Sequence, residues 1–172
     1  QAFDRKPTAC PDAVIAAGML SSEVGLFAVP HLEVPAGIDD LAQAVRVVSL
    51  VEVSERPIHF IPGIRTPPGP GPDGWTHADL MRGEEAETFG VISSPAMSGR
   101  IDLSGPTPPP AFLWPGSHTK LVEIDRDSLI ARSTTSLAGE LTQAIWNHTL
   151  IAASLPREWP KTIDPDAADA GR

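Results

Sequence analysis

The first half of the chain alternates short apolar runs with breaker-rich stretches. Residues 12–20 (DAVIAAGML) form an apolar run that ends in small residues, which predicts a buried strand entering a loop. In residues 38–48 (IDDLAQAVRVV) apolar positions recur near helical spacing behind two early aspartates, which predicts an amphipathic helix. Residues 56–64 (RPIHFIPGI) predict another strand, stopped by Pro62 and Gly63.

The second half predicts a helix, a meander of strands and a last helix. Residues 79–93 (DLMRGEEAETFGVIS) begin with an aspartate and continue at helical intervals, so we expect a helix from Asp79, weakened by an internal glycine. Residues 111–140 hold three apolar clusters separated by turn signals, which predicts three successive strands. Residues 139–155 predict a largely apolar helix that ends before Pro156.

Proline is concentrated in the middle of the chain, since twelve of the nineteen prolines lie from Pro57 to Pro115. Each proline fixes φ and removes a backbone donor, so the stretches 66–75 (TPPGPGPDGW) and 98–110 (SGRIDLSGPTPPP) are predicted as loops. The PPP tract in the second stretch favours a stiff polyproline II spacer. We therefore expect this stretch to connect two lobes.

Charge and length exclude several classes of partner. The 172 residues carry a net charge of −9, and they include no lysine and arginine cluster that would neutralise a nucleic-acid backbone. No apolar run approaches the roughly 20 residues that cross a bilayer, and no signal-type leader is recognisable. With Cys10 as the single cysteine, we expect a cytoplasmic protein without nucleic-acid or membrane partners.

The segment WPGSHTK (residues 114–120) has the composition of a phosphate-binding turn. Backbone N–H groups, two hydroxyls and an ammonium fall within one turn after a strand, which are groups that hold a phosphate. A polar hairpin turn with a solvated lysine is the alternative, because the GxxxxGK[ST] spacing is absent. The candidate phosphate-binding residues are Gly116, Ser117, His118, Thr119 and Lys120.

The segment MRGEEAE (residues 81–87) places two adjacent carboxylates, Glu84 and Glu85, beside Arg82 and after a glycine. A carboxylate near a cation can serve as a general base, and the glycine lets a ligand approach the backbone. The alternative is that these acidic residues only complement the dipole at the start of a helix. Arg82, Glu84 and Glu85 are the candidate catalytic residues, and which glutamate is the base stays open.

The segment AGMLSSEVG (residues 17–25) follows the first predicted strand. Its serine hydroxyls and its carboxylate suit the hydroxyls of a sugar-like ligand, and its glycines leave the approach open. A plain turn with the same residues is the alternative. The five histidines show no metal-ligand spacing and no GxSxG elbow is present, so neither a metal site nor a serine hydrolase is predicted.

Taken in order, five segments resemble the 2-dehydro-3-deoxygalactonokinase family, whose members carry AGMxGSxxGW-like, IPG, MRGEE, PGTHxKW-like and TGEL segments. In this chain they read AGMLSSEVGL (17–26), IPG (61–63), MRGEEAE (81–87), WPGSHTKLV (114–122) and SLAGEL (136–141). The resemblance spans about residues 13–155. Five matches in one order are far more specific than any one of them.

The resemblance implies an α/β fold of the actin-like ATPase (ribonuclease H-like) type, with two lobes that close on a sugar acid and on ATP with Mg²⁺. Residues 1–105 would be the C-terminal part of the first lobe, and residues 106–172 the start of the second. The implied reaction is phosphorylation of the terminal hydroxyl of 2-dehydro-3-deoxygalactonate. The implied sugar-side residues are Gly18, Met19, Ser21, Ser22 and Glu23.

The sequence also departs from the family pattern. Ser21 replaces a glycine and Leu26 replaces a tryptophan on the sugar side. A DWGTTN-like strand-turn and a glycine-rich adenosine region are not found, so we expect an internal fragment that needs the remainder of its own chain to hold ATP. The galacto and gluco epimers of the substrate are not distinguished.

Two other classes of function remain open from the sequence. A noncatalytic sugar-acid-binding or degenerate kinase-like module would use the same sugar-side residues without ATP. A proline-rich interaction domain would use PPGPGP and TPPPAF as ligands for aromatic grooves.

Overall fold

The computed structural model describes residues 13–97, 100, 110–155, 158 and 162. Within this part of the chain, strands and helices alternate and the strands form three separate three-stranded sheets, which confirms the predicted mixed α/β class. In chain order, with η for a 3₁₀ helix, the elements are β1 (Val14–Ala16), η1 (Gly18–Ser21), β2 (Leu32–Glu33), α1 (Ile38–Ala44), β3 (Arg46–Val48), β4 (Ile58–Phe60), β5 (Ile64–Thr66), η2 (Gly74–His77), β6 (Asp79–Met81), α2 (Glu84–Ile92), β7 (Ala111–Trp114), β8 (Thr119–Ile124), β9 (Ile130–Ser136), α3 (Ala138–His148) and η3 (Leu150–Ser154).

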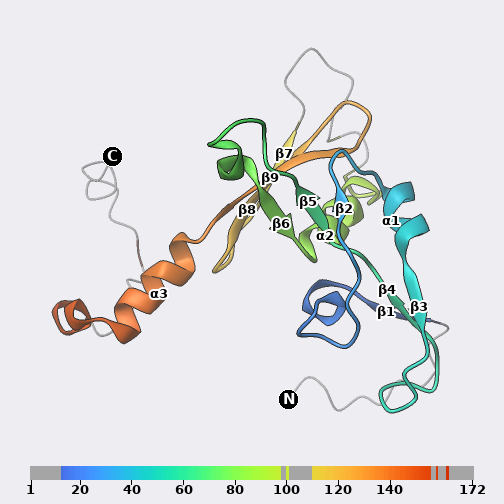
Figure 1. Ribbon diagram of the computed structural model, residues 1–172, viewed down its shortest axis with the longest axis horizontal. Helices are drawn as coiled ribbons and strands as arrows, with labels where there is room; N and C mark the ends of the chain where they lie inside the picture. The colour runs from blue at the N-terminus through green and yellow to red at the C-terminus, as the bar shows by residue number, and fades with distance from the viewer. Residues whose placement is uncertain (1–12, 98–99, 101–109, 156–157, 159–161, 163–172) are drawn as a thin grey trace.

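The first sheet has the order β1–β4–β3 and lies at the lower right of Figure 1. Strand β4 pairs parallel with β1 and antiparallel with β3. A small core forms on this sheet from Ala16, Val29, Ile58 and Phe60. The strands predicted within residues 12–20 and 56–64 are confirmed, but the first is not buried throughout, since Ile15 is 66% exposed. Strand β1 is shorter than predicted, because the chain turns into η1 at Gly18.

The helix predicted over residues 38–48 is confirmed for residues 38–44, which form α1, but the prediction is wrong for residues 46–48. The helix ends at Ala44, and residues Arg46–Val48 form β3 instead. Valine is β-branched and favours a strand where a pairing partner exists, and β4 supplies that partner. The apolar spacing that predicted one long helix therefore belongs to two elements.

The second sheet has the order β2–β5–β6, and it corrects the helix predicted from Asp79. Residues Asp79–Met81 form β6, which pairs antiparallel with β5, and the helix α2 begins only at Glu84. The helical start is displaced because Gly83 has φ 120°, which an α-helix cannot include. The pairing with β5 then decides the conformation before this glycine.

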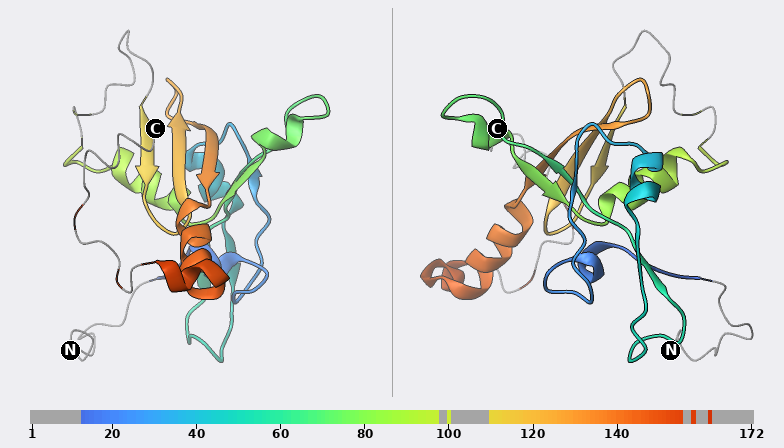
Figure 2. Two further views of the ribbon diagram at one scale, coloured as in Figure 1. Left: turned by 90° about the vertical axis from the view of Figure 1, so that its left-hand side faces the viewer. Right: turned by 45° about the vertical axis from the view of Figure 1, so that its right-hand side comes forward.

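The third sheet is the predicted meander of β7, β8 and β9, all antiparallel. In the right-hand view of Figure 2, α1 and α2 lie beside this sheet. The main core joins the β5–β6 hairpin, α1 and α2 to β8 and β9, and consists of Ala36, Leu41, Ile64, Met81, Phe89, Val122, Ile124 and Ile130. This core includes residues from both sides of the predicted lobe boundary at residues 105 and 106.

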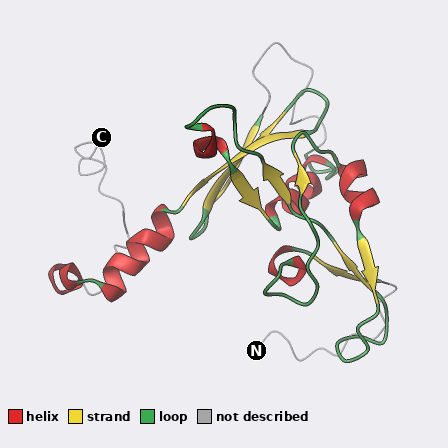
Figure 3. Ribbon diagram, in the orientation of Figure 1, coloured by secondary structure: helices red, strands yellow, loops and turns green. Residues whose placement is uncertain are grey.

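The division into two lobes stays a prediction, since most of the stretch 98–110 with its proposed polyproline spacer lies outside the described residues. The helix predicted over residues 139–155 is confirmed as α3, which is followed by η3. None of the residues of α3 is buried. Figure 3 shows α3 and η3 as a helical arm that extends away from the three sheets.

Candidate functional site

Two glycine-containing loops that are far apart in sequence lie against each other. Gly18 begins η1, and Gly83 directly precedes α2. A Cβ atom at Gly83 would lie 3.4 Å from the Cα atom of Gly18, and the φ of 120° at Gly83 is one that residues with side chains rarely adopt. The fold therefore brings the predicted sugar-side segment beside the segment with the candidate base.

Arg82 holds these two loops together through its guanidinium group. Its Nη1 donates to the carbonyl oxygen of Ser21 (2.5 Å) and to the Ser21 hydroxyl (2.9 Å). Its Nη2 donates to the carbonyl oxygen of Val29 (2.8 Å) and lies 3.2 Å from both ring nitrogens of His31. Arg82 thus binds both ends of the loop between η1 and β2, at Ser21 and at Val29.

The ring of His31 is suited to lie against this cation. Burial lowers the pKa of His31, and the positive charges of Arg82 and Arg65 lower it further. A neutral imidazole keeps one nitrogen as an acceptor, which can take a hydrogen bond from Arg82. The arrangement therefore needs His31 to be uncharged.

The two candidate base residues differ in their surroundings. Glu85 is fully buried, and both of its oxygens lie 2.8 Å from the backbone nitrogen of Gly83, which donates to them. Burial raises the pKa of Glu85, while the hydrogen bonds from backbone N–H groups and the charge of Arg82 act in the opposite direction. Glu84 is half-buried, and its Oε2 accepts a hydrogen bond from the backbone nitrogen of Arg82 (3.1 Å).

The predicted sugar-side residues also differ in exposure. The Ser21 hydroxyl is buried and donates to the carbonyl oxygen of Gly18 (3.0 Å), and the Ser22 hydroxyl donates to that of Met19 (2.7 Å). The side chains of Met19 and Glu23 are exposed. Both serine hydroxyls thus shape the loop, while Met19 and Glu23 face outward.

A small cavity of about 260 Å³ opens beside this loop. Its polar lining comes from Glu23, His31 and Arg82, and its remaining wall from Ala28, Val29 and Pro30. A carboxylate, an imidazole and a guanidinium around one small cavity suit a ligand that carries both hydroxyl and acidic groups.

The predicted phosphate-binding turn joins β7 to β8 and also contacts the start of α3. Its residues Gly116, Ser117 and His118 are exposed, and the Thr119 hydroxyl donates to the carbonyl oxygen of Gly116 (3.2 Å). The backbone nitrogen of Glu140 in α3 donates to the carbonyl oxygen of Ser117 (3.1 Å), and the Glu140 carboxylate is hydrogen-bonded to Nε2 of His118.

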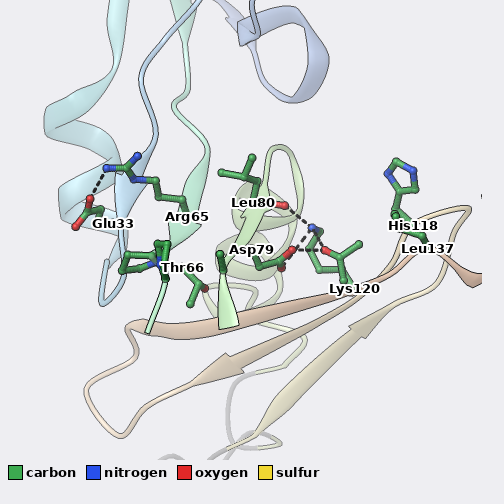
Figure 4. Close-up of a pocket in the computed structure, with 12 residues that line it drawn as sticks. Glu33, Arg65, Thr66, Asp79, Leu80, His118, Lys120 and Leu137 are labelled. Carbon is green, nitrogen blue, oxygen red and sulfur yellow. Dashed lines mark hydrogen bonds and ion pairs between the residues drawn. The ribbon is translucent and has the colours of Figure 1, made fainter. Parts of the chain in front are cut away.

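Lys120 is the buried member of this segment, with 4% of its surface exposed. Its Nζ donates to the carbonyl oxygen of Leu80 (2.6 Å) and to the hydroxyl of Thr135, and it lies 3.7 Å from Oδ2 of Asp79. Figure 4 shows Asp79, Leu80 and Lys120 converging between the β5–β6 hairpin and the third sheet. The ammonium therefore binds groups of the chain itself.

These residues line a larger cavity of about 710 Å³. Arg65 and His118 also line it. Arg65 is ion-paired with Glu33, and His118 is hydrogen-bonded to Glu140. Such exposed pairs are worth only about 0–1 kcal/mol, so an anionic ligand can replace the glutamate partners at little cost. The cavity is lined by Glu33, Arg65, Thr66, Pro67, Pro68, Ala78, Asp79, Leu80, His118, Lys120, Thr135 and Leu137.

The sequence pattern does not indicate Asp79, Thr135 or His31 as site residues. It predicts Asp79 only as the start of a helix, and Thr135 lies within the predicted strands of residues 111–140. No local pattern predicts that a hairpin places Asp79 against Thr135, because the contact depends on how two sheets pack. His31 is the first residue of the extended run HLEVPAG (residues 31–37) before α1, and this position at the start of an extended run was the one local feature that could have drawn attention to it.

Two negative findings apply to the described ranges only. Across residues 13–97 and 110–155, no group of three or more histidine, cysteine, aspartate or glutamate side chains is placed to hold a metal ion. Over the same ranges, no helix is both long and apolar enough to cross a membrane.

Comparison with known families gives one match over nearly the whole chain. The sequence profile of the 2-keto-3-deoxy-galactonokinase family matches residues 2–171. Among curated relatives, the 2-dehydro-3-deoxygalactonokinase of Escherichia coli K12 is 31% identical over 161 residues, which cover 92% of this chain and 44% of the relative. A probable 2-dehydro-3-deoxygalactonokinase of Rhizobium meliloti is 25% identical over 139 residues, which cover 81% of this chain and 39% of the relative.

A solved structure has a similar fold. The crystal structure of a proposed 2-dehydro-3-deoxygalactonokinase from Sinorhizobium meliloti aligns with a TM-score of 0.66 and 25% identity, over 86% of this chain and 42% of that one. The chain therefore spans less than half the length of the relatives that it matches.

Proposed function

Because the chain belongs to the 2-keto-3-deoxy-galactonokinase family, we propose that it takes part in the ATP-dependent phosphorylation of 2-dehydro-3-deoxygalactonate at its terminal hydroxyl. The proposed fold of the complete enzyme is the two-lobed actin-like ATPase type, and its proposed location is the cytoplasm. The observation that supports the proposal is the contact between the loops at Gly18 and Gly83, because the candidate base Glu84 directly follows Gly83 in the chain.

Glu84 is the better general base of the two adjacent glutamates. The hydroxyl of a substrate can reach a half-buried carboxylate, and only one oxygen of Glu84 has a hydrogen-bond donor among the contacts described above. Glu85 is fully buried, and both of its oxygens face the backbone nitrogen of Gly83. We therefore assign proton abstraction to Glu84, and to Glu85 the fixing of the loop before α2.

Arg82 and the sugar-side residues would position the substrate. Since Arg82 binds the backbone of the loop between η1 and β2, its proposed contribution is to hold that loop and to offer positive charge beside the small cavity. Met19 in η1 and Glu23 in the loop after it are exposed and are the proposed direct contacts. Gly18, Ser21 and Ser22 would act through the shape of the loop.

The turn at residues 116–119 is the proposed phosphate-binding segment. Gly116, Ser117 and His118 are exposed, as a phosphate contact requires, and His118 can exchange its Glu140 partner for an anion. Lys120 follows directly, and its buried ammonium supports the turn.

Mg²⁺ would arrive with the nucleotide. Magnesium ions in such sites are usually held by one or two carboxylates together with substrate phosphates, so a cage built from protein groups alone is not required. The described residues hold no group of three candidate ligands, and Glu84 is a half-buried carboxylate that directly follows Gly83. When bound with ATP, the ion would neutralise charge on the transferred phosphoryl group.

The test is a kinase assay on the natural polypeptide that contains this sequence. With ATP, Mg²⁺ and 2-dehydro-3-deoxygalactonate or its gluconate epimer, ADP release and the phosphorylated acid are measured. Glu84→Gln should lower kcat by roughly 10²- to 10⁴-fold. Glu87→Gln is the matched control, because Glu87 is an exposed carboxylate in the same helical turn.

Two results would refute the assignment. A wild-type protein that phosphorylates neither sugar acid would remove the proposed function. An active protein whose Glu84→Gln variant keeps the kcat of the Glu87→Gln control would remove Glu84 as the base.

A further inference from the structure

We propose that Asp79 and Thr135, gathered around the buried ammonium of Lys120, form a polar cluster with a positioning role. The cluster sets the position of residues 82–85, the loop at Gly83 with the first residues of α2, relative to the turn at residues 116–119. The inference rests on the proposed function, in which the loop holds the candidate base and the turn binds phosphate. The first segment follows β6 of the second sheet, and the turn joins β7 to β8 of the third sheet. Contacts between these two sheets therefore determine the position of one segment relative to the other.

The donors of Lys120 are the first argument. An ammonium group has three N–H donors. One binds the carbonyl oxygen of Leu80 in β6, a second binds the hydroxyl of Thr135 in β9, and Oδ2 of Asp79 lies in front of the group at 3.7 Å. The side chain of Lys120 is 5% exposed, so its charge is directed into the protein.

Asp79 and Thr135 complete the cluster. The Thr135 hydroxyl donates to Oδ1 of Asp79 (2.7 Å) and accepts from Lys120. The Oδ2 atom of Asp79 is buried and accepts no hydrogen bond from the described residues, so the charge of Lys120 is its nearest compensation. Lys120 and Thr135 also face each other in the β8–β9 register, so two strands of the third sheet contact one residue of the hairpin.

The position of the cluster in the chain connects it to the two functional segments. Asp79 begins β6, and this strand leads through Met81 directly into the loop with Arg82 and Glu84. Lys120 is the second residue of β8 and comes directly after the turn. Figure 4 shows Lys120 reaching from the sheet to Asp79 and Leu80 on the hairpin.

A further hydrogen bond holds the other end of the loop to the same sheet. The indole Nε1 of Trp114 in β7 donates to the hydroxyl of Thr88 in α2 (3.0 Å), and Thr88 is fully buried. The candidate base loop is thus fixed to the third sheet before it, through Asp79, and after it, through Thr88. A loop held on both sides has little freedom to move relative to the turn.

The burial of the Lys120 charge favours a role in positioning the two segments over a direct contact between Lys120 and phosphate. A buried ion pair adds little net stability, but the loss of one partner leaves the other charge buried without compensation. Removal of Lys120 therefore disturbs Asp79 and the start of β6, and its effect reaches Glu84 through the backbone. A misplacement of about 1 Å at a reacting group is enough to cost roughly 100-fold in rate.

The experiment compares three variants of the natural polypeptide that contains this sequence. Lys120→Met keeps the aliphatic stem, Asp79→Asn keeps the shape, and Thr135→Val removes only the hydroxyl. Each should lower kcat by roughly 10- to 100-fold and change the KM values for ATP and the sugar acid by less than about twofold. Glu52→Gln is the control, since it removes an exposed carboxylate from the loop between β3 and β4 that lines neither of the two cavities described above, and it should leave kcat and KM unchanged.

Two kinetic results would overturn the inference. If Lys120→Met raised the KM for ATP many-fold at unchanged kcat, Lys120 would be a direct phosphate ligand. If all variants lowered only the urea midpoint, with kcat per folded molecule unchanged, the cluster would be merely structural. Thr135→Val is the mildest change and serves where either charge variant fails to fold.

Amide hydrogen exchange gives a readout that does not need kinase activity. In Thr135→Val and Asp79→Asn, exchange should become faster together in residues 79–85 and in residues 116–120, with no change in Glu52→Gln. Faster exchange in only one of the two segments would overturn the inference even for a protein that proves inactive. An inactive wild type with coupled exchange would refute the proposed function and leave the cluster's role supported.

Discussion

Gly139 permits the contact between α3 and the phosphate-binding turn, and its replacement by alanine tests this contact. A Cβ atom at this position would lie 2.9 Å from the carbonyl oxygen of Ser117, 3.0 Å from its Cα atom and 3.1 Å from the carbonyl oxygen of Gly116. All three are backbone atoms, which cannot rotate away. The start of α3 must therefore move away from the turn in Gly139→Ala.

Two opposing effects set the size of the change. Glycine to alanine within a helix favours the helix by up to about 1 kcal/mol. Against this stand the hydrogen bond from the nitrogen of Glu140 to Ser117, worth about 1 kcal/mol, and the exposed hydrogen bond between His118 and Glu140, worth about 0.5 kcal/mol. With backbone repulsion added, the contacts prevail, and α3 should lose at least about 0.5 kcal/mol.

Gly90→Ala in α2 is the matched control, because a Cβ built there has no described atom within 4 Å apart from its chain neighbours and the backbone of its own helix. Only the helix preference acts at this site, so amide exchange in α2 should slow by up to about fivefold. In Gly139→Ala, exchange in α3 should become about two- to threefold faster or more. If Gly139→Ala instead slowed exchange in α3 as Gly90→Ala does in α2, the contact between α3 and the turn would be absent.

Three further predictions concern the loop before α2. Burial raises the pKa of Glu85 above the value of about 4.3 that a glutamate has in the unfolded chain, so the folded state binds the proton more tightly. The protonated side chain therefore stabilises the folded state fully below the unfolded pKa, and this stabilisation is lost as the pH rises through the folded pKa. Glu85→Gln should remove this pH dependence. Urea unfolding of wild type and variant from pH 4 to pH 8 measures it, and a difference in unfolding free energy that stays constant with pH would contradict the raised pKa. Gly83→Ala forces a side chain into φ 120° beside Gly18 and should cost about 1–3 kcal/mol in unfolding free energy, whereas an unchanged urea midpoint would show that the loop relaxes freely. Thr88→Val leaves the indole nitrogen of Trp114 without its partner and should cost about 1–3 kcal/mol; tryptophan fluorescence during unfolding reports it, and a loss below about 0.5 kcal/mol would mean that water replaces the hydroxyl.

Several local features could be predicted because neighbouring residues decide them. The β7–β9 meander follows from three apolar clusters separated by turn residues, and each strand pairs with the next one in the chain. The same is true of α3 and of most of α1, where apolar spacing and early aspartates act within one or two turns. Motif order along the chain likewise predicted the family.

The two wrong boundaries have one cause. At Arg46–Val48 and at Asp79–Met81 a helical spacing of side chains is present, but each segment pairs with a strand that lies elsewhere in the sequence. Local spacing contains no information about such a partner, and the free energy of pairing exceeds the small preferences of single residues.

The sequence by itself determined which residues have chemistry to offer: the carboxylates after Gly83, the polar turn before Lys120 and the small residues around Gly18. Only the tertiary structure decided how they are used. The adjacent Glu84 and Glu85 look equivalent in sequence, but in the structure Glu85 is fully buried and Glu84 is only half-buried. Packing of the β5–β6 hairpin on β9 likewise brings Lys120 close to Asp79. The physical reason is that exposure and charge compensation depend on what packs against a side chain, and in this fold those neighbours come from distant segments of the chain.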